Sequence, residues 1–229
     1  MIFLQIISQP AVQTAVQKTT EQLTLSLWDL TLKGGPVMIP IALLSVISIY
    51  VFIERFIAIR NAGKEDYNFM NNIKEYISDG KIDNAIALCK SQNSPVARMI
   101  EKGIRRIGRS LNDVNAAIEN VGKLEVSGLE KGLPLLATSA GAAPMLGFLG
   151  TVTGMVRAFY NMANAGNNID ITLLSSGIYE AMVTTVAGLI VGIIAYLAYN
   201  YLVTRVEHIV YILEARTTEF MDLLNEPIK

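Results

Sequence analysis

The stretch ITLLSSGIYEAMVTTVAGLIVGIIAYLAYNYLV, residues Ile171–Val203, decides the fold class, because Glu180 is the one charged side chain in its thirty-three residues. A helix needs about 20 apolar residues to cross a hydrocarbon layer about 30 Å thick. At about 1.5 Å per residue, a helix of this length would measure about 50 Å. We therefore predict a membrane-spanning helix that tilts or continues beyond the bilayer.

Two earlier segments, Pro36–Ile53 and Gly132–Val156, contain no charged side chain. The composition agrees with a membrane protein, since 52% of the 229 residues are hydrophobic and only 17% are charged, against about a quarter in soluble domains. The sequence therefore predicts an all-α fold: a three-span transmembrane helical protein with long helices extending into a cytoplasmic helical domain. The net charge of −1 argues against a nucleic-acid partner, because no basic surplus exists to neutralise phosphates.

The distribution of basic residues predicts the direction of the spans. Segment 54–131 holds thirteen of the nineteen lysines and arginines, and such residues accumulate on the cytoplasmic side. We expect the N-terminus in the periplasm and the C-terminus in the cytoplasm of a bacterium. The expected organisation is a periplasmic arm (1–35), a first span (36–53), a cytoplasmic helical domain (54–131), a second span (132–156), a short periplasmic loop (157–170), a third span (171–203), and a cytoplasmic helix and tail (204–229).

Helical spacing continues outside the spans. It predicts cytoplasmic helices over 65–79, 82–90 and 95–107, the first ended by Gly80 and the third started by Pro95. Ser110 and Asp113 resemble a capping box, from which a helix is expected to continue past Lys131 into the second span.

The N-terminal arm allows two interpretations, since residues 11–32 are compatible with either a flat amphipathic helix or a disordered arm. The first ten residues lack a basic residue, so we interpret them as retained rather than as a signal peptide.

Small residues recur at helical spacing in the second and third spans. Gly150 and Gly154 form the small-xxx-small pattern of close helix packing in lipid. Packing against another subunit or a partner helix is the favoured interpretation, and packing within the chain is the alternative. The residues assigned to helix packing are Gly147, Gly150, Gly154, Gly177, Ala181, Gly188 and Gly192.

Glu180 is the main candidate functional residue, because a charged carboxylate inside a bilayer costs several kcal/mol on the lowest scales. With no basic residue inside the uncharged segments, we expect it to be neutral, hydrated or hydrogen-bonded to hydroxyl groups. A carboxyl group among hydroxyls suits proton passage, although Glu180 could instead fix the helix register. Residues Glu180 and Thr185 lie about 140° apart around a helix, so we expect at most one to face a narrow lumen. The candidate hydroxyls are those of Thr151, Thr153, Thr184 and Thr185.

The sequence offers little for an enzyme or a metal site. Cys89 is the only cysteine and His208 the only histidine. We interpret Cys89 as a buried small side chain and His208 as a helix-surface residue. No nucleophile–base pair, metal-ligand spacing or phosphate-binding glycine loop is recognisable, so we expect neither catalysis nor a cofactor other than protons as the coupling ion.

Two motifs carry a family resemblance. APMLGFLGTVTGM (Ala143–Met155) and GIYEAMVTTVAGL (Gly177–Leu189) resemble the second-span and third-span patterns of the MotA/TolQ/ExbB proton-channel proteins. The segment ALCKSQNSPVARMIEKGI (Ala87–Ile104) resembles the cytoplasmic region of that family. Three spans favour the ExbB and TolQ branches over the four-span flagellar branch.

The resemblance implies a channel subunit of the bacterial inner membrane. It implies a homopentamer around two copies of an ExbD-like single-span subunit that carries a membrane aspartate, with a TonB-like protein as the periplasmic partner. By match to the family motifs, Thr151, Glu180 and Thr185 would line the proton pathway, with Thr153 and Thr184 as secondary lumen candidates. Thr153 replaces a bulky residue, often Trp, which would make that end of the lumen wetter. A TolQ-like role in envelope constriction and a structural scaffold without proton conduction are the alternatives.

Overall fold

The computed structural model describes residues 34–64, 68–164 and 171–225, without the side chains of 171–173, and these segments are helices joined by short connections. The N-terminal arm predicted over residues 1–35 lies almost entirely outside the described residues. The described helices are α3 (Met38–Ala62), α4 (Phe69–Ser78), α5 (Ile82–Ser91), α6 (Pro95–Ile104), α7 (Leu111–Glu130), α8 (Leu133–Asn164) and α9 (Ile171–Asn225).

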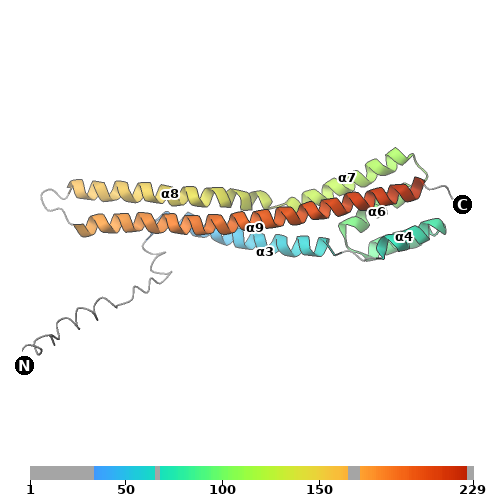
Figure 1. Cartoon of the computed structure of the whole chain (residues 1–229), viewed down its shortest axis with the longest axis horizontal. Helices are drawn as coiled ribbons and strands as arrows, with labels where there is room; N and C mark the ends of the chain where they lie inside the picture. The colour runs from blue at the N-terminus through green and yellow to red at the C-terminus, as the bar shows by residue number, and fades with distance from the viewer. Residues whose placement is uncertain (1–33, 65–67, 165–170, 226–229) are drawn as a thin grey trace, which may run out of the picture.

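The molecule is an elongated bundle in which α8 and α9 run antiparallel, side by side (Figure 1). Helix α3 packs against both of them, and α4, α5, α6 and α7 gather at the far end around the last turns of α9. Three segments are long and apolar enough to cross a membrane, and they contain α3, α8 and α9. The all-α fold with three candidate spans is therefore confirmed.

Local signals in the sequence explain where the small helices begin. Ser94 caps α6 by accepting a hydrogen bond from the Ala97 amide at 3.2 Å, and Pro95 occupies the first turn. Ser110 caps α7 in the same way, accepting from the Asp113 amide at 3.2 Å. The three predicted helices of this region are confirmed, except that α4 begins at Phe69 rather than at residue 65 and α6 ends at Ile104 rather than at residue 107.

The connection between α7 and α8 corrects one expectation. We predicted a helix running through Lys131 into the second span, but α7 ends at Glu130 and α8 begins at Leu133. Lys131 has an extended ψ of 125°, and Gly132 has a φ of 89°. Only glycine adopts that left-handed φ at little cost, so Gly132 interrupts the helix where it leaves the helical domain.

Two helices are longer than their apolar segments. Helix α8 continues to Asn164, so residues 157–164 are helical rather than part of the loop predicted over 157–170. Helix α9 has 55 residues without interruption, which makes it about 80 Å long. The third span therefore continues directly into the helical domain.

The core of this domain is built by side chains from α4 to α7 and from the end of α9. Phe220 of α9 and Ile118 of α7 are fully buried. They meet over Gly103 of α6, where an added Cβ would lie 2.7 Å from both side chains. This contact ties the end of the third span to the small helices.

Cys89 lies in the same core, and we expect it to resist alkylation. Only 2% of the residue is exposed, and burial together with the charge of Glu101 raises the pKa of its thiol to about 12. The thiolate is the reactive form, so at about pH 8 nearly all of the thiol stays protonated. Maleimide labelling followed by mass spectrometry should show modification only after denaturation.

The labelling control is a Ser127→Cys variant in a Cys89→Ala background, because Ser127 is exposed. That cysteine should react fully in the folded protein. Equal labelling rates for the native Cys89 and the introduced cysteine would contradict the buried position.

Candidate functional site

The contact between α8 and α9 is made by small residues. A Cβ added at Gly188 would lie 2.5 Å from the Ala143 carbonyl oxygen, and one added at Gly192 would lie 2.5 Å from Pro144 Cγ. At Gly154 the nearest atom would be Ala181 Cβ, at 3.0 Å. The two backbones therefore approach as closely as glycine permits, and these small residues pack within one chain, as in the alternative interpretation of the sequence. The predicted contact with another subunit stays a prediction. The seven residues placed at this contact are Gly147, Gly150, Gly154, Gly177, Ala181, Gly188 and Gly192.

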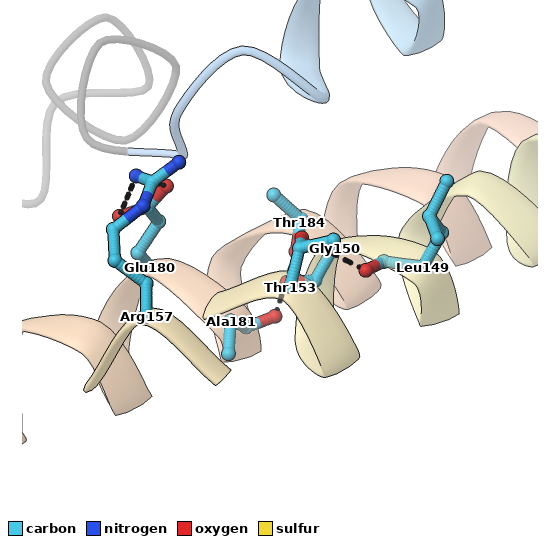
Figure 2. A network of polar contacts seen from close by, with 7 residues as sticks. All are labelled: Leu149, Gly150, Thr153, Arg157, Glu180, Ala181 and Thr184. Carbon is cyan, nitrogen blue, oxygen red and sulfur yellow. Dashed lines mark hydrogen bonds and ion pairs between the residues drawn. The ribbon is translucent and has the colours of Figure 1, made fainter. Parts of the chain in front are cut away.

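Two threonines of α9 belong to this contact. The Thr185 hydroxyl donates a hydrogen bond to the Gly147 carbonyl of α8 at 3.0 Å. Thr184 is 1% exposed and donates to the Ala181 carbonyl of its own helix at 2.8 Å. Thr184 fills the space beside Gly150, where no side chain would fit (Figure 2). The Thr185 hydroxyl therefore links the two helices, whereas Thr184 contributes to the contact by packing against Gly150.

The threonines of α8 lie differently. Thr151 is half-buried and donates to the Phe148 carbonyl at 2.6 Å. Thr153 is exposed and donates to the Leu149 carbonyl at 2.9 Å and to the Gly150 carbonyl at 3.1 Å. All four candidate hydroxyl groups therefore donate to backbone carbonyls, so hydrogen bonding of Glu180 to these hydroxyls, one of the three alternatives that the sequence left open, is not found in this structure.

Glu180 instead has a charged partner. Its carboxylate accepts from Nη1 of Arg157 on α8, at 3.0 Å to Oε1 and 3.3 Å to Oε2 (Figure 2). We expected no ion-pair partner for Glu180, because Arg157 lies just beyond the uncharged segment of the second span. That expectation is corrected by the length of α8, which carries Arg157 past Glu180 on the neighbouring helix. The exposed fractions of the side chains are 21% for Glu180 and 51% for Arg157.

A third element reaches the pair. Gly35, which immediately precedes α3, has a φ of 65°. A Cβ added at Gly35 would overlap the Glu180 carboxylate, and Figure 2 shows the chain before α3 passing beside the two side chains. We name Gly35, Arg157 and Glu180 the three-helix junction, because they come from the beginning of α3 and from α8 and α9.

The junction also changes the expected depth of Glu180. We expected this carboxylate inside the bilayer, and it lies level with Gly35, just before the first apolar helix begins. The hairpin of α8 and α9 extends beyond the beginning of α3 (Figure 1). The third apolar segment, which contains Glu180, is longer than a bilayer is thick, so part of it lies past the end of the first span. Glu180 is therefore at one mouth of the bundle, and Thr185 is about 7.5 Å deeper along α9.

Sequence reasoning missed Arg157 and Gly35, although a signal for Arg157 was present. In an antiparallel helical hairpin, residues at equal distances from the connection lie level with each other. Arg157 precedes the end of α8 by seven residues, and Glu180 follows the beginning of α9 by nine. Counting outward from the connection would have paired them. The contact of Gly35 depends on how the first helix packs, which the sequence pattern does not encode.

Substituting Gly35 by alanine should destabilise the protein by about 2–5 kcal/mol. Alanine must adopt a left-handed φ, which costs about 1–2 kcal/mol, and its Cβ must displace the Glu180 carboxylate, at an overpacking cost of about 1–3 kcal/mol. Thermal unfolding of the purified protein in detergent measures the combined effect.

Gly80 provides the matched control, because its φ is 71° and an added Cβ would meet nothing within 4 Å. Gly80→Ala should therefore show the backbone strain alone. In a Glu180→Ala background the cost of Gly35→Ala should fall to the cost of Gly80→Ala. An unchanged cost in that background would show that the carboxylate does not lie against Gly35.

Among the described residues, no group of three or more His, Cys, Asp and Glu side chains is placed to hold a metal ion. The chemistry of the three-helix junction is therefore that of a carboxylate and a guanidinium. Such a pair can exchange one proton at the carboxylate, and protonation of Glu180 would release Arg157 from its charge partner.

The model for the MotA/TolQ/ExbB proton channel family matches residues 91–215 of this chain. The match begins in the helical domain and includes α8 and most of α9, with Arg157 and Glu180 inside it. It therefore covers more than half of the chain.

Individual relatives agree with this match. The "Putative biopolymer transport protein ExbB-like 1" of Synechocystis sp. is 33% identical over 181 residues, which cover 78% of this chain and 71% of that protein. The "Tol-Pal system protein TolQ" of Haemophilus influenzae is 31% identical over 186 residues, covering 72% and 77%. The "Biopolymer transport protein ExbB" of Neisseria meningitidis is 27% identical over 187 residues, covering 74% and 83%. Relatives named for both branches thus match to similar degrees.

Proposed function

This chain belongs to the MotA/TolQ/ExbB proton channel family, and on that premise we propose that it is the large, channel-forming subunit of an inner-membrane motor complex driven by the proton-motive force. The complex would energise TonB-dependent transport across the outer membrane. Family membership makes the chain a transport protein rather than an enzyme. Three long apolar helices agree with a multi-pass membrane protein.

The observation that carries the proposal is the ion pair between Glu180 and Arg157 at the mouth of the helix bundle. An isolated charge in a span costs about 2.5–3.5 kcal/mol or more, whereas the two opposite charges offset each other. A structural role would be served equally well by two neutral hydrogen-bonding residues. A carboxylate at this place can in addition accept and release a proton.

In the proposed mechanism, Glu180 accepts a proton from the aqueous side and becomes a neutral carboxylic acid. The charge attraction to Arg157 is then lost, and the half-exposed guanidinium is free to bind another acceptor. An aspartate of the single-span partner is the acceptor that fits this charge. Thr151 and Thr185 would line the deeper path, with Thr153 and Thr184 beside it. One proton crossing 100 mV releases about 2.3 kcal/mol, which suffices to bias a helix between two positions.

The proposed assembly and orientation follow from the charge distribution and the family. The helical domain and the end of α9 would lie in the cytoplasm, because most lysines and arginines are there. The junction would then open toward the periplasm, where protons enter. We propose a homopentamer of this chain around an ExbD-like single-span subunit, with a TonB-like protein as the periplasmic partner.

A TolQ-like role is the second candidate, supported by the 31% identity to the "Tol-Pal system protein TolQ" of Haemophilus influenzae. Deleting the gene in its own bacterium decides between the two roles. Loss of energy-dependent uptake across the outer membrane with an intact envelope supports the first role. Envelope leakage and chains of undivided cells would support the second, and an unchanged phenotype in both assays would contradict both.

A further inference from the structure

A cavity of about 430 Å³ lies between α3 and α9, away from the three-helix junction. Its basic lining residues are Arg60 from α3 and Arg205 and His208 from α9, and none of the described acidic residues is in its lining. In a chain with a net charge of −1, the two arginines at this one cavity form a local excess of positive charge. The size is within the range of small-molecule sites.

Aromatic side chains hold one of these cations in place. Arg205 donates from Nε to the Tyr201 hydroxyl at 3.3 Å, and its Cζ lies 5.3 Å from the centre of the Tyr201 ring. Tyr201 in turn stacks on Phe56 of α3, with ring centres 6.2 Å apart. The guanidinium is thus held at its Nε edge, and its two terminal nitrogens donate no hydrogen bond to another described residue.

The floor of the cavity is apolar, because Ile59, Leu202 and Ile209 are at most 4% exposed. The outer surface of α3 beside it is also apolar, since Ile57 is 54% exposed. The site therefore combines cations with a surface suited to hydrocarbon.

The position of the cavity identifies the kind of ligand. Its lining residues lie around the ends of the first and third apolar segments, at Ile53 and Val203: Tyr201 and Leu202 are the last residues before Val203, and the other lining residues follow these two ends. If these segments span the bilayer, the cavity lies at the level of the lipid headgroups. Arginine is the side chain best suited to bind phosphate oxygens in pairs, and basic pockets between spans are typical sites for anionic headgroups.

We propose that this cavity binds the phosphodiester headgroup of an anionic phospholipid, with the acyl chains lying along α3 and α9. Arg60 and Arg205 hold the phosphate, and Tyr201 positions Arg205. The inference rests on the three spans and not on proton conduction. A bound lipid here would tie the end of the first span to the third span, next to the helical domain.

The test uses the full-length protein purified from bilayers of phosphatidylcholine and phosphatidylglycerol. Lipids retained by the protein are quantified by mass spectrometry. The wild-type protein should retain phosphatidylglycerol preferentially, and the variant Arg60→Gln/Arg205→Gln should reduce that preference by about tenfold. Sedimentation of each variant checks that it remains folded and assembled.

The control variant Arg106→Gln/Arg109→Gln removes the same charge outside the cavity, between α6 and α7, and should leave the preference unchanged. Tyr201→Phe keeps both arginines but removes the hydroxyl that accepts from Arg205, and it should weaken retention by about threefold. This second variant keeps the test decisive if the double variant fails to fold.

Two results would overturn the proposal. One is equal phosphatidylglycerol retention by the wild-type protein and by both cavity variants. The other is displacement of the retained lipid by inorganic phosphate alone, which would make the site one for a free anion. Lipid retention is measured without an ion gradient, so its outcome is separate from that of the proposed channel function.

Discussion

Glu180→Gln is expected to abolish energy-dependent work by the complex while leaving the amount of assembled complex unchanged. Glutamine has nearly the shape of glutamate and can still hydrogen-bond to Arg157, but it cannot carry a proton or balance the guanidinium charge. We expect activity to fall by at least about a hundredfold, as for removal of a proton-transfer group. Complementation of a deletion strain measures activity, and affinity purification measures assembly.

Glu75→Gln is the matched control, because Glu75 is exposed on α4 in the helical domain. It makes the same chemical change outside the spans and should retain full activity. If Glu180→Gln complements as well as Glu75→Gln does, the carboxylate has only a structural role, and the scaffold interpretation is preferred. If the Glu180→Gln variant fails to assemble, assembly of the Arg157→Gln variant is measured in the same way. Failure of both variants to assemble would show that the ion pair holds the bundle together.

Gly188→Ala should cause the largest loss of stability among the single-methyl substitutions in α9. The added Cβ would lie 2.5 Å from the Ala143 carbonyl oxygen and 2.9 Å from the Gly147 Cα. Both are backbone atoms, so no side chain can move aside, and α8 must shift. We expect a destabilisation of about 1–3 kcal/mol, measured as a lower midpoint of thermal unfolding in detergent.

Gly141→Ala is the control for this packing prediction. Gly141 is inside α8, the helix that Gly188 of α9 contacts, but a Cβ added at Gly141 would meet nothing within 4 Å. Because alanine favours helices over glycine by about 0.5–1 kcal/mol, this variant should be neutral or slightly stabilised. Equal unfolding midpoints for the two variants would contradict the close contact of α8 and α9.

The fold was largely predictable because its helices follow strong local signals. Uncharged segments of sufficient length identify the spans, and Pro95 and Ser110 mark helix starts through their own backbone chemistry. The break at Gly132 was not predictable in the same way. A glycine inside a continuous helical pattern is compatible with either a helix or a left-handed turn, and its contact with the first span decides which forms.

The candidate site was predictable in its residue types but not in its pairing. A lone carboxylate in an apolar segment indicated Glu180 directly. Its partner was missed because the uncharged segment was taken as the limit of the helix, whereas α8 continues beyond it to Asn164. Hydrogen bonds from the hydroxyl groups to the carboxylate were one of the alternatives considered, but threonine in a helix readily donates to a backbone carbonyl one turn earlier. The partners of Glu180 and of the threonine hydroxyls therefore depend on contacts that the sequence pattern does not specify.

The most direct test of proton conduction is proton flux through the purified complex in liposomes. The chain is co-reconstituted with its single-span partner, a potassium gradient with valinomycin sets the membrane potential, and a pH-sensitive dye reports proton entry. We predict voltage-driven flux for the wild-type complex and only background leakage for the complex carrying Glu180→Gln. A wild-type complex that passes no protons, or a Glu180→Gln complex that conducts as well as the wild type, would contradict the role assigned to Glu180.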